Sequence, residues 1–525
     1  MQLLHAIGTS HEELRGKRGL QLYYDALLFL IAYPDNKEVY AIANESLRQL
    51  QSSIGSKENT RTSLYNTGVT GSAVCAAFSF EMVKWLRKTR PHDIKLRSFE
   101  ASDAQIQAIL SVVMPKVESE ILQDANTEWR GWLKRSKKKE EDLMDQLIDI
   151  FDSTSIRPEV KDELWNAIGI NTEINFSSHC CLPGRLVSPY YHRSLKRKNI
   201  NDRAILKATQ IKLSDIEAAQ VLDCSRMILI RHLRELDPIS FSAPNLVSYY
   251  RLPRGLSIAL TSMVADRRHP IDSYMGYVVF KNGLPVAYAG SWIMFDSARI
   301  GLNVFPSYRG GESQYIFQQA MQLHSKVYGL NRFSVDPYQI GKENSDAIHS
   351  GAFWVYYHAG FRPLLKTQQE IAATEAHKIK TKPGYRSSSK ILAKLADCRM
   401  QMTMNNRAIK IDATDLSIAW LTILQKKYKG NRVLASADAV KKIAVTLKIK
   451  NWQDEKMRFI LENWAALLLP SEKELRSNLA LKRSVKELFE LKAKGIEEDF
   501  IKAMQKSVSL RKFLEKLIDD SSNML

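Results

Sequence analysis

Residues 304–313 read Val-Phe-Pro-Ser-Tyr-Arg-Gly-Gly-Glu-Ser, and this stretch decides which fold we expect. It continues a β-rich run, Ala298–Phe305, and precedes a segment with helical apolar spacing, Gln314–Tyr328. The first turn of a helix leaves backbone N–H groups without partners, and the helix dipole adds partial positive charge there. A strand, a glycine turn and a helix in this order therefore predict an anion site.

The segments on both sides of this turn predict a mixed α/β domain. Asn282-Gly283 lies between two β-rich runs, Tyr274–Phe280 and Leu284–Met294, which is the strongest short-range signal for a hairpin. After the turn, Arg332–Asp336 reads as a strand, and Asp346–Ala359 reads as one helix closed by a glycine. Strands and helices thus alternate around the turn.

The turn resembles the acyl-CoA binding turn of the GNAT superfamily of N-acetyltransferases, in which a strand ends near a proline and a glycine turn opens a helix. Residues 356–361, Tyr-Tyr-His-Ala-Gly-Phe, are similar to that family's closing Tyr-x-x-x-Gly-Phe, and residues 209–219 resemble its first strand and helix. The resemblance covers residues 203–365. It implies an α+β chain whose GNAT-like mixed sheet is flanked by mainly helical regions.

The resemblance also implies the reaction and its residues: transfer of an acyl group, acetyl in the simplest case, from acyl-CoA to an amine, without a metal. The backbone around Asn303 and Val304 would polarise the thioester carbonyl. Tyr356 matches the tyrosine proposed to protonate the leaving thiolate, and its alternative role is that of a core tyrosine. The pyrophosphate would be held by Arg309, Gly310, Gly311, Glu312 and Ser313.

Two positions depart from the family pattern, and the general base is hard to find. Ser307 stands where the family usually has Gln or Arg, and Glu312 stands where it usually has Gly or Ala. A carboxylate beside a pyrophosphate repels it unless Arg309 or another cation pairs with the carboxylate, and Glu312 could instead cap the helix. Asp336 is our candidate base because it ends the strand expected beside the thioester. Its alternative is a turn-capping role before proline, and Asp296 and His358 are also candidates.

Charge is concentrated in one segment. The chain carries a net charge of +19, and residues 366–450 hold 18 lysines and arginines against 6 aspartates and glutamates. Such a segment attracts RNA, DNA, anionic lipid or an acidic partner, whereas the alternative is a solvated lysine-rich helical surface. We expect a helical N-terminal domain at 1–125, a helical or irregular connection at 126–202, the α/β domain at 203–365 and a basic helical region at 366–525.

The cysteines and the apolar runs indicate in which cellular compartment we expect the protein. Five cysteines without a Cys-x-x-Cys pair argue against a disulfide scaffold and a zinc ribbon, and they fit a reducing cytosol. The N-terminal region lacks a signal peptide and an apolar run long enough to cross a bilayer. We therefore expect a cytoplasmic protein without a membrane span.

Three functions are consistent with the sequence. The first is a GNAT-type acyltransferase acting on a small-molecule or peptide amine. The second is a non-catalytic GNAT-like scaffold whose basic segment binds nucleic acid or an acidic partner. The third is acyl transfer from aminoacyl-tRNA, which a basic flank would suit. The acceptor, the acyl chain length and the oligomeric state are open.

Overall fold

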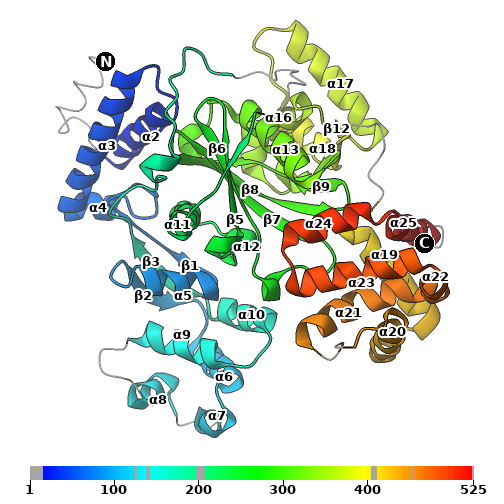
Figure 1. Ribbon diagram of the computed structural model, residues 1–525. Coiled ribbons are helices and arrows are strands. Elements are labelled where there is room, and N and C mark those ends of the chain that lie inside the picture. Colours follow the sequence, from blue (N-terminus) through cyan, green and yellow to red (C-terminus); the bar gives the residue numbers. More distant parts are fainter. Residues whose placement is uncertain are drawn as a thin grey trace.

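The computed structural model describes residues 16–122, 127–136, 142–196, 207–403, 411–450, 452 and 454–522. This part of the chain is α+β and contains a large mixed sheet surrounded by helices, as the sequence predicts at this level (Figure 1). Its buried side chains form three hydrophobic cores, one around the large sheet, one in the N-terminal region and one in the C-terminal helices. The boundary expected between residues 202 and 203 lies outside the described residues.

The large sheet has ten strands, in the order β12-β13-β11-β9-β8-β7-β6-β5-β4, with β10 also paired to β8. All neighbours are antiparallel except β9 and β11, which run parallel. The strands are β4 (Thr209–Ile211), β5 (Val247–Leu252), β6 (Leu256–Thr261), β7 (Ser273–Lys281), β8 (Leu284–Met294), β9 (Ser297–Ile300), β10 (Asn303–Val304), β11 (Arg332–Val335), β12 (Arg362–Pro363) and β13 (Met400–Thr403).

Local sequence signals explain the centre of this sheet. The predicted hairpin is present between β7 and β8, where Asn282 and Gly283 have φ angles of 47° and 86°, as the tight turn requires. Helix α11 (Asp215–Arg231) begins at a capping box in which Ser214 and Glu217 satisfy each other's backbone N–H groups. A short helix, α12 (Asp237–Ser240), follows it.

One pair of strands separates partway along its length. β9 pairs with β11 from Ser297 to Arg299, but β10, which continues the same run of chain, pairs only with β8. The two strands therefore diverge beyond Arg299, and β11 ends at Val335. The glycine turn and α13 (Ser313–Tyr328) come directly after β10, so the anion turn borders this divergence.

Three short helices follow β11, namely α14 (Pro337–Ile340), α15 (Ser345–Ser350) and α16 (Ala352–His358). The single helix expected over 346–359 is thus divided into two. The break occurs at Gly351, whose φ of 66° lies in the left-handed region that ends a helix.

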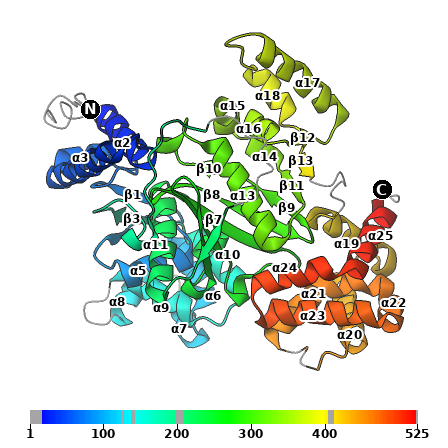
Figure 2. The ribbon, with the colours of Figure 1, turned by 45° about the horizontal axis from the view of Figure 1, so that its top comes forward.

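The sheet extends past residue 365, where we expected the α/β domain to end, because β13 lies between β11 and β12. The chain reaches β13 through α17 (Lys366–Thr381) and α18 (Ser389–Leu395). These two helices project from the edge of the sheet as an arm, which we call the basic arm, residues 366–394 (Figure 2).

The N-terminal part contains strands as well as the expected helices. A three-stranded antiparallel sheet, in the order β1-β3-β2, joins β1 (Ala73–Ala77), β2 (Ile94–Phe99) and β3 (Ile170–Asn175). β1 is rich in alanine, a poor strand former, so its pairing with β3 decides its conformation. The helices are α2 (Lys17–Ala32), α3 (Lys37–Ser56), α4 (Glu58–Ser63), α5 (Phe80–Thr89), α6 (Asp103–Val113), α7 (Lys116–Leu122), α8 (Trp129–Ser136), α9 (Leu143–Ser153) and α10 (Pro158–Ile168).

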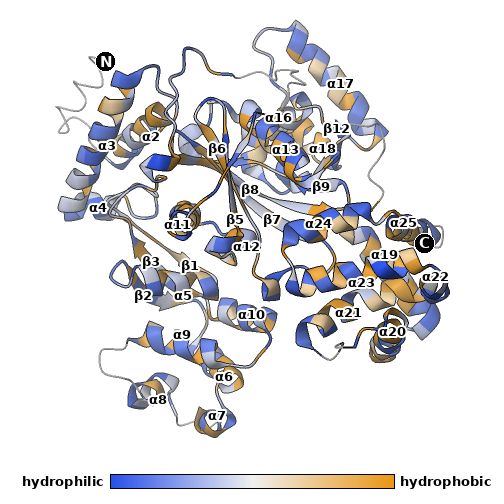
Figure 3. Cartoon of the chain, viewed as in Figure 1, coloured by the Kyte–Doolittle hydropathy of each residue, from blue (hydrophilic) through white to orange (hydrophobic). Residues whose placement is uncertain are grey.

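The C-terminal region is helical, as expected, and its helices carry both hydrophobic and hydrophilic residues (Figure 3). Their buried side chains form a separate hydrophobic core, which Met294 and Phe295 join. Trp464 and Phe489 lie within this core. Among the residues described, we find no helix with the length and apolar character needed to span a membrane. The helices are α19 (Ala413–Tyr428), α20 (Arg432–Leu447), α21 (Glu455–Leu468), α22 (Glu472–Ser477), α23 (Leu479–Lys494), α24 (Glu497–Lys506) and α25 (Val508–Ser522).

Candidate functional site

A cavity of about 550 Å³ lies where β10 separates from β11. Its walls come from β8, β10, the glycine turn, the start of α13, helices α14 to α16 and the loop after α11. Six of the nine site residues predicted from the sequence line it, and Gly311, Glu312 and Asp336 do not. Those six are Asn303, Val304, Arg309, Gly310, Ser313 and Tyr356.

The two glycines of the turn have different surroundings. Gly310 is exposed, has a φ of 85° and faces open space, since a Cβ added there would meet nothing within 4 Å. Gly311 packs against Tyr33, just after α2, so closely that a Cβ would lie 2.7 Å from the ring. Gly310 therefore lies on the cavity side of the turn, and Gly311 lies on the side that packs against Tyr33.

The mouth of α13 offers backbone donors to the cavity. Ser313 is the first residue of the helix and lines the cavity, and the N–H groups of a first helical turn have no acceptors within the helix. Two cations, Arg309 and Arg234, also line the cavity. Together with the helix dipole, they make this end of the cavity favourable for phosphate groups.

Strand β10 directs backbone groups into the divergence. Phe305 N–H donates to Val286 of β8, 3.1 Å between nitrogen and oxygen. Because alternate residues of an antiparallel strand point their polar groups to opposite sides, Val304 turns its N–H and C=O away from β8 and toward the cavity. The Val304 N–H is thus directed toward the cavity and takes no part in the pairing of β10 with β8.

Tyr356 on α16 lines the same cavity as Val304. Its Oη accepts a hydrogen bond from the Leu302 N–H at 3.2 Å, which leaves the hydroxyl proton free to donate. Burial raises the pKa of Tyr356 to about 12, so the phenol stays protonated at neutral pH. The residue also belongs to the main hydrophobic core, where its ring meets Phe317 edge-on.

Glu312 turns away from the cavity. It occupies the N-cap position of α13 without capping the helix through its side chain. Its carboxylate is fully buried and pairs with Lys281 and Arg254, at 2.7 and 2.5 Å between nitrogen and oxygen. Of the two expectations for Glu312, pairing with a cation is therefore observed and helix capping is not, and the cations are not Arg309.

The three candidate bases lie outside the cavity lining. Asp336 directly follows β11 and forms ion pairs with Arg299 and Arg399, at 3.2 and 3.4 Å. Asp296 pairs with Arg332 and Arg511, and its backbone oxygen accepts from Asn331 and Arg332. His358 lies at the end of α16. Neither aspartate is a free carboxylate facing the divergence.

Sequence reasoning missed an aromatic wall of the cavity. His232, directly after α11, stacks on Phe305 with ring centres 4.5 Å apart, and Phe305 stacks on Tyr288 of β8 at 5.2 Å. Ser291 of the same strand bonds His324 of α13, so Tyr288 faces the opposite side of the sheet from that helix. The cavity therefore has walls on both faces of the sheet. These residues come from segments distant in the chain, so no local motif marks them.

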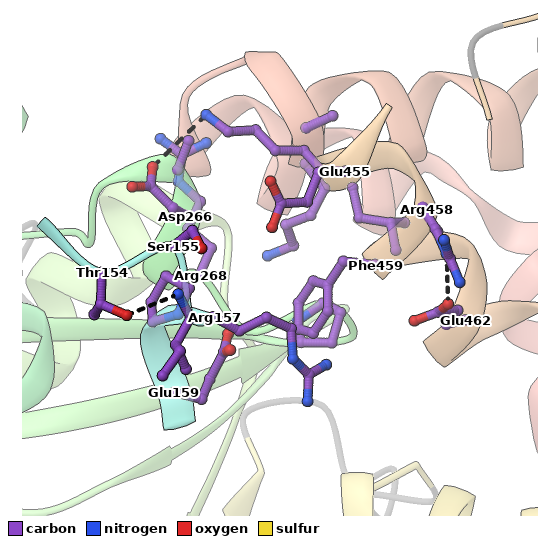
Figure 4. A pocket seen from close by; sticks show the side chains of 18 residues that line it. Thr154, Ser155, Arg157, Glu159, Asp266, Arg268, Glu455, Arg458, Phe459 and Glu462 are labelled. Carbon is purple, nitrogen blue, oxygen red and sulfur yellow. Dashed lines mark hydrogen bonds and ion pairs between the residues drawn. The ribbon is translucent and has the colours of Figure 1, made fainter. Parts of the chain in front are cut away.

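A second hollow, of about 660 Å³, lies between the loop before α10, residues 265–270 and α21 (Figure 4). None of the predicted site residues lines it. Several of its charged groups already have partners, since Lys456 pairs with Asp266 and Arg458 pairs with Glu462. Mutual pairing of this kind is typical of a space between packed regions.

Comparison of the chain with protein-family models, with curated proteins and with solved structures found no match. Within the described ranges, no group of three or more His, Cys, Asp or Glu side chains is arranged to hold a metal ion. The cavity beside β10 is thus the feature on which a functional proposal can be built.

Proposed function

We propose that the chain is an N-acyltransferase with a GNAT-like central sheet, which moves an acyl group from acyl-CoA to an amine. The observation that carries the proposal is the cavity itself, which joins the glycine turn, the backbone of β10 and Tyr356 at the point where two parallel strands diverge. Its volume of about 550 Å³ lies within the ordinary range for small-molecule sites. The five free thiols favour a cytoplasmic enzyme.

The donor would lie along the divergence. Its pyrophosphate would meet the N–H groups at the mouth of α13 and the guanidinium of Arg309, because both favour negative charge. The pantetheine arm would then pass between β10 and the short helices after β11. This pose brings the thioester to the Val304 backbone and Tyr356, which line the same cavity.

The chemistry follows from these two groups. The amine nitrogen forms a bond to the thioester carbon, and the negative charge that develops on the carbonyl oxygen is stabilised by the Val304 N–H. The carbon–sulfur bond then breaks, and the hydroxyl of Tyr356 gives its proton to the thiolate. The amine nitrogen loses its proton to water, and water returns a proton to the Tyr356 phenolate, so the products are an amide and free CoA.

Thermal unfolding in the presence of acetyl-CoA, a longer acyl-CoA and free CoA tests this proposal. A donor present at 100 times its dissociation constant stabilises the native state by roughly 2.7 kcal/mol. Release of free CoA thiol in the presence of a panel of amines then identifies the acceptor. If none of the three CoA species raises the melting temperature, the chain is not an acyl-CoA enzyme.

A second candidate function rests on the basic arm. Its exposed cations form no ion pair with a carboxylate of the described residues, and they lie on the two projecting helices and on the connection between them (Figure 2). Most of the other described cations of residues 366–450 lie elsewhere, on or directly beside α19 and α20. Such an arm suits a phosphate backbone, whose counterions are released on binding. The cations are Lys366, Lys380, Lys382, Arg386, Lys390 and Lys394.

Binding of RNA, including tRNA, at several salt concentrations tests the second function. Replacing Lys382, Arg386 and Lys390 together by glutamate should weaken RNA binding and reduce the slope of log affinity against log salt by about 2–3. Lys448, Lys450 and Arg432, replaced in the same way on and beside α20, provide a control of equal charge. Equal losses in both variants would show that the arm is not the binding surface.

A further inference from the structure

The acidic residue of the glycine turn is the centre of a buried network. Glu312 Oε2 accepts from Lys281 Nζ at 2.7 Å, and Oε1 accepts from Arg254 Nη2 at 2.5 Å and from the Lys196 backbone N–H at 2.9 Å. The side chains of Glu312 and Lys281 are both completely buried. Because a buried carboxylate is stable only when it is paired and hydrogen-bonded, these contacts fix where Glu312 lies.

The two cationic partners of Glu312 come from the ends of two hairpins. Lys281 precedes the Asn282-Gly283 turn, and its ammonium also donates to the backbone oxygen of Arg254 at 2.7 Å. Arg254 lies in the turn between β5 and β6 with a φ of 68°. The two hairpins are thereby joined to each other and to the residue that follows Gly311.

The same network reaches the first turn of α13. The guanidinium of Arg254 lies 5.9 Å from the ring centre of Tyr315 on that helix, while the ammonium of Lys281 lies 5.4 Å from the ring of Tyr33, which supports Gly311. Arg254 therefore contacts both Glu312 and the first turn of α13, and Lys281 contacts both Glu312 and the tyrosine that packs on Gly311. Movement of either cation would displace the backbone donors at the mouth of α13.

We propose that Lys281, Arg254 and Glu312 are positioning residues for the donor's pyrophosphate, holding the glycine turn and the mouth of α13 in the shape that binds it. The inference rests on the proposed function for the identity of the donor. None of the three residues lines the cavity, so they act through the backbone and not by touching the ligand. Lys281 and Arg254 carry two positive charges against the one negative charge of Glu312. This buried network therefore does not repel an anion bound at the turn.

Three variants of the full chain separate positioning from simple stabilisation. Lys281→Met removes the cation, Glu312→Gln removes the negative charge while keeping its shape, and the double variant removes both. Lys281→Met leaves Glu312 with Arg254 as its one cationic side-chain partner, and Glu312→Gln leaves the buried Lys281 without a carboxylate, so each single variant will lower the melting temperature. The double variant should regain part of that loss, because it removes the unpaired ammonium as well. Lys326→Met, an exposed residue near the far end of α13, is the control.

We expect the dissociation constant for CoA, measured by calorimetry on folded protein, to rise about 10- to 100-fold in all three variants and to stay unchanged in the control. In turnover with the acceptor amine, KM for acetyl-CoA should rise while KM for acetyl-pantetheine, which lacks the pyrophosphate, does not. Recovery of stability in the double variant without recovery of CoA affinity is the sign of positioning.

The outcomes distinguish this inference from the proposed function. If the wild type binds CoA and the three variants bind it equally well, or if Glu312→Gln binds it more tightly, the positioning role is wrong and the function stands. If the wild type binds inorganic pyrophosphate but no CoA, and Lys281→Met loses pyrophosphate binding, the positioning role stands and the function is wrong. If the wild type binds neither probe, both are wrong.

Discussion

Replacing Gly310 by aspartate tests the anion site with the least disturbance to the fold. The residue is exposed at the mouth of α13, and an added Cβ would meet no atom within 4 Å. Its φ of 85° strains any side chain, but Asp and Asn tolerate this region better than other residues. Asparagine at the same position has the same size and the same backbone strain, so Gly310→Asn is the matched control.

The charge sets the size of the effect. Two unit charges 4 Å apart repel by about 1 kcal/mol in water and by about 4 kcal/mol at an effective dielectric constant near 20. Gly310 lies at the boundary between these limits, and a pyrophosphate carries more than one negative charge. A repulsion of about 3 kcal/mol is therefore reasonable, which weakens CoA binding roughly 10²-fold.

Calorimetric titration of CoA into both variants at low and at high salt measures this effect. We expect Gly310→Asp to bind CoA about 10²-fold more weakly than Gly310→Asn, and we expect the ratio to shrink as salt screens the exposed charge. Circular dichroism should show the same fold in both. If the two variants bind CoA within twofold of each other, no phosphate lies at this turn, and the donor pose described above is wrong.

Three further predictions follow from the structure. Tyr356→Phe should lower turnover by about 10²–10⁴-fold with little change in CoA affinity. Tyr357→Phe, whose side chain lies outside the cavity lining, should keep its activity. Equal turnover in the two variants would show that Tyr356 serves only as a core residue. Gly311→Ala should lower the melting temperature because its Cβ meets Tyr33, and Tyr33→Leu in the same chain should restore part of the loss seen in unfolding scans. Below pH 6.5 the free energy of unfolding should fall, because the unfolded chain takes up protons that the native state does not. The fall is up to about 1.4 kcal/mol per pH unit for each histidine that burial keeps neutral in the native state. Urea titrations from pH 7 to pH 5 measure this slope, and His324→Gln should reduce it by one proton; burial lowers the pKa to about 4 in His192 and His324 and to about 3 in His232.

The sequence predicts those parts of the fold that short-range interactions decide. The Asn282-Gly283 turn, the capping box at Ser214 and the helix after the glycine turn depend on residues within a few positions of one another, so their signals are local. The separation of β9 from β11 depends on pairing between residues 35 positions apart, such as Ser297 and Arg332. No residue pattern near either strand marks where this pairing ends.

The parts that could not be predicted depend on contacts between distant segments. The pairing of Glu312 with Lys281 and Arg254 spans 31 and 58 residues, and nothing in the sequence around Glu312 indicates either partner. Asp336 had a clear local signal at the end of a strand, yet Arg399, 63 positions further on, holds its carboxylate. Strand β1 depends in the same way on its pairing with β3.

The two departures from the acyl-CoA turn pattern have a common explanation in the fold. Ser307 Oγ donates to Asp25 of α2 at 2.6 Å, and Glu312 pairs with Lys281 and Arg254, so both side chains point into the protein and neither lines the cavity. In the sequence they weigh against CoA binding, because a family glutamine or arginine is missing and a carboxylate has been added. In the structure Ser307 and Glu312 anchor the side of the turn that packs against the protein. The backbone N–H groups at the mouth of α13, on the cavity side, remain available to the donor that we propose. Ser307 therefore marks where α2 joins the α/β domain, and Glu312 marks where the glycine turn joins the two hairpins beneath it. Since neither side chain lines the cavity, neither departure counts against our proposed donor site.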